Sequence, residues 1–471
     1  MTNQKLTALM LAGALALGLC GGAVLAADPV EPDTSAVEEQ ETQPEVQADT
    51  SASQAEAAQE PSEEGTTEES GDTQEPQEPA QPDPDPEGTL SFANVDSRVR
   101  SGDYNCLVLG ETIAQVEATD YEKLQEELRE GLNDIANAQW QLHTSGSQIN
   151  TGIPALDEAL KGMVSMSTSS ASQTLQAQYD ALREQFDDLK EGKIQKEASD
   201  TVRQLKSTQD GLVLLAQSMY VQLSELQATD ASLQRALDAL DRQLEELELR
   251  YELGQISSLT LQQAKSGRTS LVSQKQTLES SASTLTMNLQ SMIGSSLTGT
   301  LRLAALPQVT DQQLSVMDLE TDLAAAKEAS YTLYAAKKTL DDAEETYKDA
   351  GKEYNYNENK YQFVQAQHAW QAAQYTYDGA VQSFELSFRT LYAQVKDYQQ
   401  VLQAAQTALA VEQDNYAVDQ LKYEQGTISE NTLLTAKDDL DTAQDTVNTA
   451  QRNLFSAYNN YRWAVDYGIL N

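Results

Sequence analysis

The sequence predicts an all-α protein built from long antiparallel coiled-coil hairpins in two internal repeats. Three observations support this. Apolar residues recur at alternating steps of three and four over long stretches, which is the period of an amphipathic helix. Of the eleven prolines, only Pro154 and Pro307 lie beyond residue 88, so few positions interrupt a helix. One turn sequence occurs twice, 172 residues apart, which indicates duplicated hairpins.

Seven-residue repeats predict the seams along which the helices pack. The spacing runs from Leu226 to Leu247 with one polar interruption at Asp230, from Ala264 to Met292, and from Ala436 to Ala464. Such a repeat keeps one apolar seam facing a partner helix and imposes a left-handed supercoil. A helix over 360–424 would be about 98 Å long, so we expect an elongated bundle. A further seam comprises Val381, Phe384, Phe388, Leu391, Val395, Tyr398, Leu402, Ala405 and Leu409.

Residues 1–27 are typical of a secretory signal peptide. Lys5 forms a short basic start, an apolar run spans 6–19, and small residues follow near Ala26. This pattern predicts export and cleavage, because the run is too short to span a membrane. Cleavage would remove Cys20 and leave Cys106 without a partner. No internal disulfide is then expected, and stability must come from helix packing.

Residues 28–90 read as an acidic, Pro-rich disordered tether. The part from 28 to 88 holds 20 acids, nine prolines and no Lys, Arg or aromatic residue, so it cannot bury enough apolar surface to fold. We interpret it as a solubilising spacer, with an acidic arm for cations or basic polymers as the alternative. The formal net charge of the chain is −43. This charge excludes nucleic acid as a partner, because such binding relies on Lys and Arg at phosphates.

The sequence offers no pattern that predicts catalysis. The two histidines, His143 and His368, do not lie near a Cys or a carboxylate at metal-ligand spacing. We therefore expect no metal, no cofactor and no enzymatic activity. His368 lies in a helical stretch and is interpreted as a surface residue.

Two interruptions divide the remaining chain into two repeats. The first is expected over 91–305, with a Ser-, Thr- and Gly-rich insertion at 144–172 that we predict as a loop containing one short helix around Pro154. The second is expected over 306–471. Pro307 lies in the break between them.

The duplicated turn carries the sharpest signal. Residues 249–265 and 421–437 are identical at ten of seventeen positions. In each copy a glycine ends the helix after a cation in its last turn, and a serine follows three residues later. Glycine suits the left-handed conformation that closes a helix, a cation there favours the helix dipole, and serine caps the next helix. Each copy is therefore predicted to be a tight turn at the end of a long helical pair.

These turns and the Ala-rich heptads that follow resemble the TolC family of outer-membrane efflux proteins, over roughly 175–294 and 318–470. The resemblance implies a homotrimer in the cell envelope, in the outer membrane where the organism has one. It also implies an adaptor (membrane fusion) protein in the periplasm, an inner-membrane pump, and passive efflux through a helical duct. By position, the adaptor-docking tips would be Arg250, Leu253, Gly254, Ser257, Lys422, Gly426 and Ser429.

The sequence departs from that family in two places. The far turns, Glu191–Lys193 and Gly351–Asn359, are too short for two membrane-spanning strands of about 9 to 11 residues each. The β-barrel strands of the family are therefore expected to be short or absent. Thr432 and Thr435 stand where family members can carry carboxylates at the aperture. The alternative function is a structural coiled-coil protein of the envelope that keeps the scaffold without a spanning pore.

Overall fold

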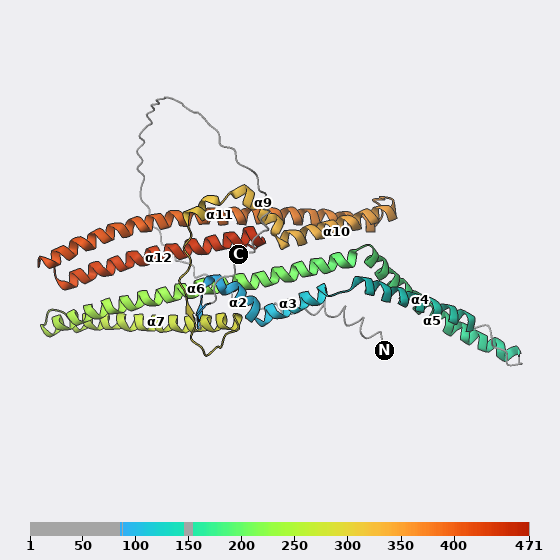
Figure 1. Cartoon of the computed structure of the whole chain (residues 1–471), viewed down its shortest axis with the longest axis horizontal. Helices are drawn as coiled ribbons and strands as arrows, with labels where there is room; N and C mark the ends of the chain where they lie inside the picture. The colour runs from blue at the N-terminus through green and yellow to red at the C-terminus, as the bar shows by residue number, and fades with distance from the viewer. Residues whose placement is uncertain (1–84, 87, 146–153, 471) are drawn as a thin grey trace, which may run out of the picture. The chain divides into compact units, whose positions relative to one another are not determined.

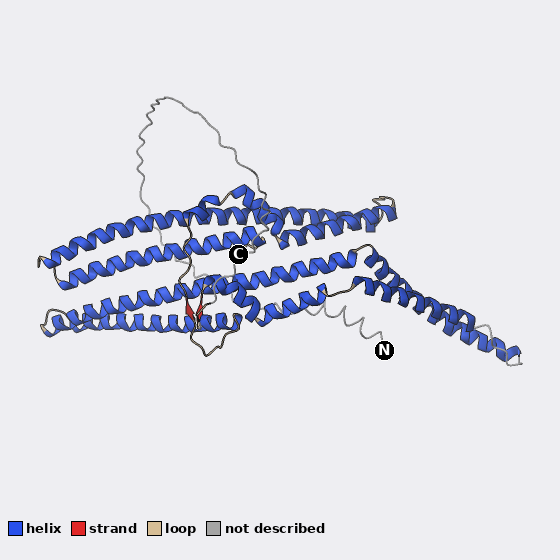
Figure 2. Cartoon of the chain, viewed as in Figure 1, coloured by secondary structure: helices blue, strands red, loops and turns tan. Residues whose placement is uncertain are grey.

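The structure is a computed structural model that describes residues 85–86, 88–145 and 154–470. The predicted signal peptide and nearly all of the predicted tether lie outside these residues. The described part is almost entirely helical (Figures 1 and 2), which confirms the predicted fold class.

Two long helical hairpins form the two repeats. Helix α6 (Lys193–Glu252) packs against α7 (Ser258–Met292), and α11 (Tyr361–Glu424) packs against α12 (Glu430–Tyr467). Helix α11 has 64 residues, which corresponds to about 96 Å. The long helix predicted over 360–424 is therefore confirmed.

Further helices precede each hairpin. The 3-10 helix η1 (Phe92–Asn94), α2 (Val95–Gly102), α3 (Tyr104–Glu117), α4 (Tyr121–Ser145) and α5 (Pro154–Lys190) precede α6, whereas α8 (Asp311–Val316), α9 (Leu319–Ala329) and α10 (Tyr331–Tyr354) precede α11. In the two repeats these preceding helices pack against different partners. Helix α10 lies along α11, whereas its counterpart α5 pairs mainly with α4, and α3 packs on α6 instead.

The predicted seams form the cores of the hairpins. On α11 the seam residues Phe384, Phe388, Leu391 and Val395 are buried, and they pack with residues of α9 and α12. The polar interruption at Asp230 also has an explanation. Its carboxylate lies 2.6 Å from Nζ of Lys275 on α7, so a cross-hairpin ion pair takes the place of an apolar contact.

We expect Phe388→Ala to destabilise the fold strongly. The ring is fully buried and its centroid lies 5.4 Å from that of Tyr461 on α12. Truncating such a ring removes buried area and leaves a cavity, at a cost of about 3 to 5 kcal/mol. Urea unfolding followed by circular dichroism measures this, with the exposed Leu215 changed to Ala as the control. A loss below about 1 kcal/mol would contradict the packing of α11 on α12 at this position.

The predicted end of the tether at residue 90 is wrong. Strand β1 (Thr89–Leu90) pairs in parallel with β2 (Arg302–Leu303), and Leu90 is fully buried. The hydroxyl of Tyr220 on α6 lies 3.1 Å from the carbonyl oxygen of Leu90 and 2.6 Å from that of Ala304. A strand of two residues has no periodicity to reveal it, so its partners in the chain define it rather than its own sequence.

The predicted loop insertion at 144–172 is also wrong over its described part. Helix α5 begins at Pro154 and continues to Lys190. Proline is tolerated in the first turn, where its missing N–H would have no helical partner. The hydroxyls of this stretch bond back to helix carbonyls, as Thr168 Oγ1 does to Val164 O at 2.7 Å, so its Ser and Thr content does not break the helix.

Both far turns are short. Gly192, with φ +79°, joins α5 to α6, as the sequence predicted. In the second repeat α10 runs past Gly351 to Tyr354, so the turn is narrower than the predicted 351–359. No strand lies in either turn within the described residues. None of the described helices combines the length and apolarity that crossing a membrane requires.

Candidate functional site

The two turns predicted as docking tips have the same backbone geometry. Gly254 has φ +71° and Gly426 has φ +70°. In the first tip, Gln255 N–H donates to Arg250 O at 2.8 Å and Gly254 N–H donates to Tyr251 O at 2.9 Å. This pair of bonds is the Schellman motif. The second tip repeats it with lengths of 2.9 and 2.8 Å, so the sequence repeat is also a structural repeat.

A serine starts the returning helix in both tips. Ser257 Oγ accepts from Thr260 N–H, and Ser429 Oγ accepts from Thr432 N–H, each at 3.2 Å. These bonds satisfy backbone donors that a helix start leaves without partners. The predicted capping roles of both serines are confirmed.

The predicted tip cations are partly engaged by their own helices. Arg250 pairs with Glu246, and Lys422 Nζ lies 2.6 Å from Asp419. Both cations remain at least half exposed, and such surface pairs are weak. Both cations are therefore accessible from solvent despite these pairs.

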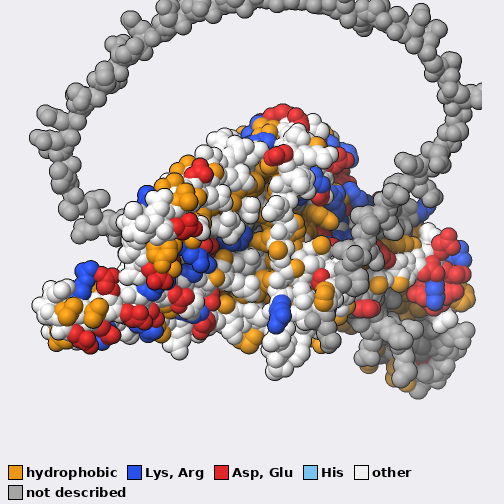
Figure 3. Space-filling model, turned by 60° about the vertical axis from the view of Figure 1, so that its left-hand side comes forward, with side chains coloured by type: hydrophobic (Ala, Val, Ile, Leu, Met, Phe, Trp, Pro, Cys, Tyr) orange, Lys and Arg blue, Asp and Glu red, His pale blue; other side chains and the backbone are white. Residues whose placement is uncertain are grey.

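Apolar side chains accompany these charges at the tips. Leu253 is 64% exposed and Leu259 is equally exposed. On the forward-turned end in Figure 3, hydrophobic side chains lie among acidic and basic ones. The exposed apolar residues near the two tips are Leu249, Tyr251, Leu253, Leu259, Val418, Leu421 and Tyr423.

Two ion pairs lie between the repeats, where α6 packs against α12. Arg235 and Arg242 on α6 pair with Asp445 and Asp438 on α12, respectively. The two arginines are seven residues apart, and so are the two aspartates, so the ion pairs follow one another along α6 and α12. Arg242 lies twelve residues before Gly254, and Asp438 lies twelve residues after Gly426. The sequence carried this signal in the matched spacing, but the sequence analysis did not identify it.

Thr432 and Thr435, which stand at the positions expected for the aperture, form local hydrogen bonds. Thr432 Oγ1 lies 2.9 Å from Ser429 Oγ, and Thr435 Oγ1 donates to Asn431 O at 2.9 Å. Both hydroxyl groups therefore form hydrogen bonds at the N-cap and in the first turns of α12.

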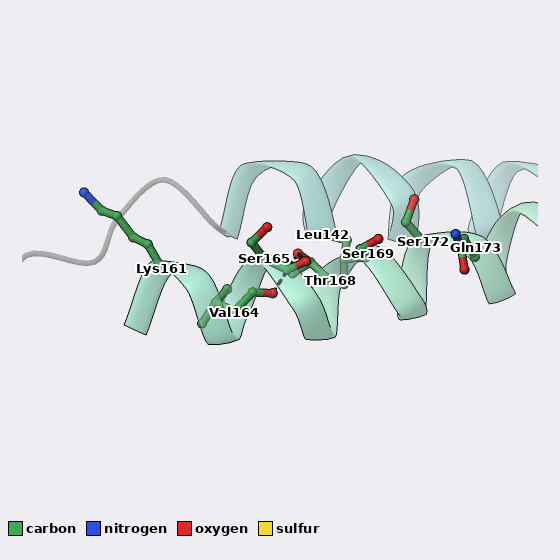
Figure 4. Close-up of a pocket in the computed structure, with 8 residues that line it drawn as sticks. All are labelled: Leu142, Lys161, Val164, Ser165, Thr168, Ser169, Ser172 and Gln173. Atoms are coloured by element: carbon green, nitrogen blue, oxygen red, sulfur yellow. Dashed lines mark hydrogen bonds between the residues drawn. The ribbon is translucent and has the colours of Figure 1, made fainter. Parts of the chain in front are cut away.

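A hollow of about 440 Å³ lies between α4 and α5 (Figure 4). Leu142 lines it from α4, and α5 contributes hydroxyl and amide groups. Two of the hydroxyl-bearing side chains are Thr168, whose oxygen is bonded to its own helix, and Ser165. The described lining residues include no histidine, cysteine or carboxylate, so they do not form a nucleophile–base pair.

The remaining candidate residues, Cys106 and His368, lie on different helices, α3 and α11. Cys106 is buried, and burial raises the pKa of its thiol to about 11, so it is protonated at neutral pH. His368 lies exposed on α11, and the side chain of His143 lies outside the described ones. Among the described residues, no three His, Cys, Asp or Glu side chains are grouped to hold a metal ion.

A face of α11 forms a second feature, which the sequence analysis missed. Six exposed apolar residues fall within an arc of about 100° on this helix, opposite to its buried seam. Between 361 and 418, all of which is described, Asp397 is the one Asp, Glu, Lys or Arg in that arc. Small exposed residues such as Ala393 and Ala404 lie between the larger ones. We call this surface the α11 stripe, and its six apolar residues are Tyr361, Tyr375, Leu386, Val401, Val411 and Val418.

No protein-family model and no curated protein matches the sequence. Solved structures similar to the chain include the outer membrane protein VceC from Vibrio cholerae, with 17% identity and a TM-score of 0.35 over 59% of this chain and 76% of that one. CusC shows 16% identity and a TM-score of 0.42 over 80% and 96%. The outer-membrane channel OprN shows 13% identity and a TM-score of 0.46 over 80% and 90%.

The chain is similar to these outer-membrane channels in its helical architecture. The solved structures are channels of the family that the duplicated turn resembles. The case for a TolC-like function rests on the tips and the α11 stripe.

Proposed function

We propose that this protein is an exported, TolC-like duct component of a tripartite efflux or secretion system. In this proposal three copies form a passive channel in the cell envelope. The tips dock on an adaptor, and an inner-membrane pump supplies the energy. The observation that carries it is the pair of tips with the same backbone geometry, at the ends of two long hairpins.

Self-association follows from the α11 stripe. Six large apolar side chains and several small ones lie exposed along one face of a helix of about 96 Å. Fully burying one Val, Leu or Tyr side chain stabilises by about 1.5 to 3 kcal/mol. A neighbouring copy can bury this face without desolvating charges, apart from Asp397.

Docking of an adaptor follows from the chemistry of the tips. Each tip presents an exposed leucine or valine beside a cation that is held by a weak surface pair. An interface of this kind has an apolar centre and a charged rim. A partner with an apolar knob and acidic neighbours fits it.

The test combines imaging with site-specific crosslinking. Purified mature protein should appear as trimeric tubes, and a photo-crosslinker at Leu253 or Gln425 should capture one adaptor in whole cells. The same crosslinker at Leu215, which is also exposed on α6, serves as the control because it lies about 57 Å along the helix from Leu253. Capture of the adaptor from Leu215 and not from the tips would contradict the docking assignment.

The second candidate is a structural coiled-coil protein of the envelope. The short far turns favour it, because neither contains a strand within the described residues. Extended monomers in the same images, with no adaptor captured at the tips, would support this function over the duct.

A further inference from the structure

The turn between α10 and α11 has an unusual composition. Residues 354–361 read Tyr-Asn-Tyr-Asn-Glu-Asn-Lys-Tyr. We call this segment the tyrosine turn. The equivalent turn of the first repeat is built around Gly192 and has no aromatic residue. The tips of the two repeats share one backbone geometry, whereas the far turns differ in composition. A hairpin can therefore close without the composition of the tyrosine turn.

The backbone of the tyrosine turn adopts a conformation that bulky residues disfavour. Asn355 and Tyr356 have φ of +50° and +53°. Asparagine tolerates this region, but a tyrosine there is an outlier. Tyr356 N–H donates to Gly351 O at 2.9 Å, and Asn357 N–H donates to Tyr354 O at 3.2 Å. The turn therefore holds a ring at a position where glycine would be less strained.

Neighbouring rings fix the orientation of Tyr356. Its ring lies edge-on to Phe363 and Tyr347, with centroids 5.7 and 6.5 Å away. Tyr347 in turn stacks on Trp370 at 5.0 Å. The ring of Tyr356 also lies against the backbone of Gly351, where an added Cβ would be 2.3 Å from it. This packing holds the ring rigidly, and yet Tyr356 stays 56% exposed.

The residues around this ring are polar and exposed to solvent. Tyr361 is 70% exposed, and the amide-bearing residues Asn355, Asn357 and Asn359 are exposed beside it. Glu358 and Lys360 are exposed as well. Charged groups at this spacing oppose insertion into a bilayer. Rigid rings between amides instead suit a ligand that has both apolar faces and hydroxyl or amide groups.

We propose that the tyrosine turn binds a neutral glycan of the cell envelope, through pyranose rings packed on Tyr356 and Tyr361. The C–H face of a sugar ring meets the negative face of an aromatic ring favourably. The asparagine side chains supply donors and acceptors for hydroxyl and N-acetyl groups. Glu358 and Lys360 give the turn no net charge of its own, so its charge does not favour a charged polymer over an uncharged one.

This site does not depend on the adaptor, although it requires export. Tyr356 lies outside the α11 stripe, whereas Tyr361 is the first residue of that stripe and would be shared between the glycan and a neighbouring copy. The site lies at the start of α11, whereas the docking tips lie at the end of that helix, about 96 Å along it. Binding to a wall polymer at one end would leave the other end open to its partner.

The test measures binding of two soluble glycans to the full mature chain by calorimetry. The probes are chitohexaose, which carries N-acetyl groups, and cellohexaose, which does not. We expect Tyr356→Ala and Tyr361→Ala each to weaken binding about tenfold or more, and Tyr356→Phe to bind within about threefold of the parent because it keeps the ring face. Tyr104→Ala is the matched control, since this tyrosine is 80% exposed on α3 and lies outside both the turn and the α11 stripe.

Circular dichroism melting checks that each variant is folded, and Tyr361→Ala keeps the test valid if Tyr356→Ala loosens the turn. Preference for chitohexaose would assign the N-acetyl group to the asparagines, and equal binding would assign recognition to the rings. Absence of saturable binding of both glycans by the parent would overturn the proposal. So would equal binding by the Tyr361→Ala variant, or tyrosine-dependent sedimentation with phosphatidylglycerol–phosphatidylethanolamine vesicles in place of glycan binding.

Discussion

A chain that carries Leu386→Arg and Val411→Arg is expected to be a folded monomer under conditions in which the parent forms trimers. Both side chains are exposed on the α11 stripe, opposite to the buried seam of the same helix. In an assembled protein they would face a neighbouring copy, where an unpaired charge is costly to bury. A loss of roughly 3 kcal/mol per interface corresponds to about 150-fold weaker association.

Mass photometry over a dilution series measures this effect, and circular dichroism checks the fold. The matched control carries Gln374→Arg and Gln403→Arg. These exposed positions lie about a quarter-turn or more from Leu386, and they add the same charge. If both double variants assemble like the parent, the stripe is not the interface. If both are monomeric, the added charge and not the stripe causes the loss.

The second large effect is expected at the tips. Gly254 and Gly426 have positive φ, and a Cβ built on either would meet no atom within 4 Å. Space is therefore not the constraint at these positions, and the backbone conformation is. Valine in both positions should cost about 1 to 2 kcal/mol per tip. That is too little to unfold helices of this length, but it is enough to lower the population of the native turn by a factor of about 5 to 30.

Asparagine provides the matched control, because it tolerates the left-handed region. We expect Gly254→Val with Gly426→Val to lose adaptor crosslinking and export while helicity persists. The corresponding double Asn variant should retain most of both. Full export by the Val variant would show that the repeated turn is architectural, and equal losses in both variants would point to the added side chain rather than to the backbone.

Much of the hairpin architecture could be predicted because it depends on local periodicity. The seam through Phe388 and Val395 follows from steps of three and four, and the tip geometry follows from a glycine between a cation and a serine. The pairing of β1 with β2 could not be predicted, because two residues carry no pattern. Helix α5 was missed because Ser and Thr hydroxyls can bond within a helix as well as outside it.

The α11 stripe was missed for a different reason. Its alanines and valines alternate with Gln, Ser and Thr, so no single window of the sequence is strongly apolar. The signal lies in the near absence of charge from one face over 58 residues, from 361 to 418. A search for charge-free helical faces would have found it. A search for matched seven-residue spacings would have found the ion pairs of Arg235 and Arg242 with Asp445 and Asp438.

The bond between Tyr220 and the carbonyl of Leu90 has a mechanical consequence. Tyr220 lies 27 residues after the start of α6 and 32 before its end, which is about 40 and 48 Å from either end. The chain that precedes β1 is therefore joined to the folded unit near the middle of this helix. A force applied through the N-terminal segment would act near the middle of α6, at the level where α7 ends, and would leave the tips and the tyrosine turn free to engage separate partners.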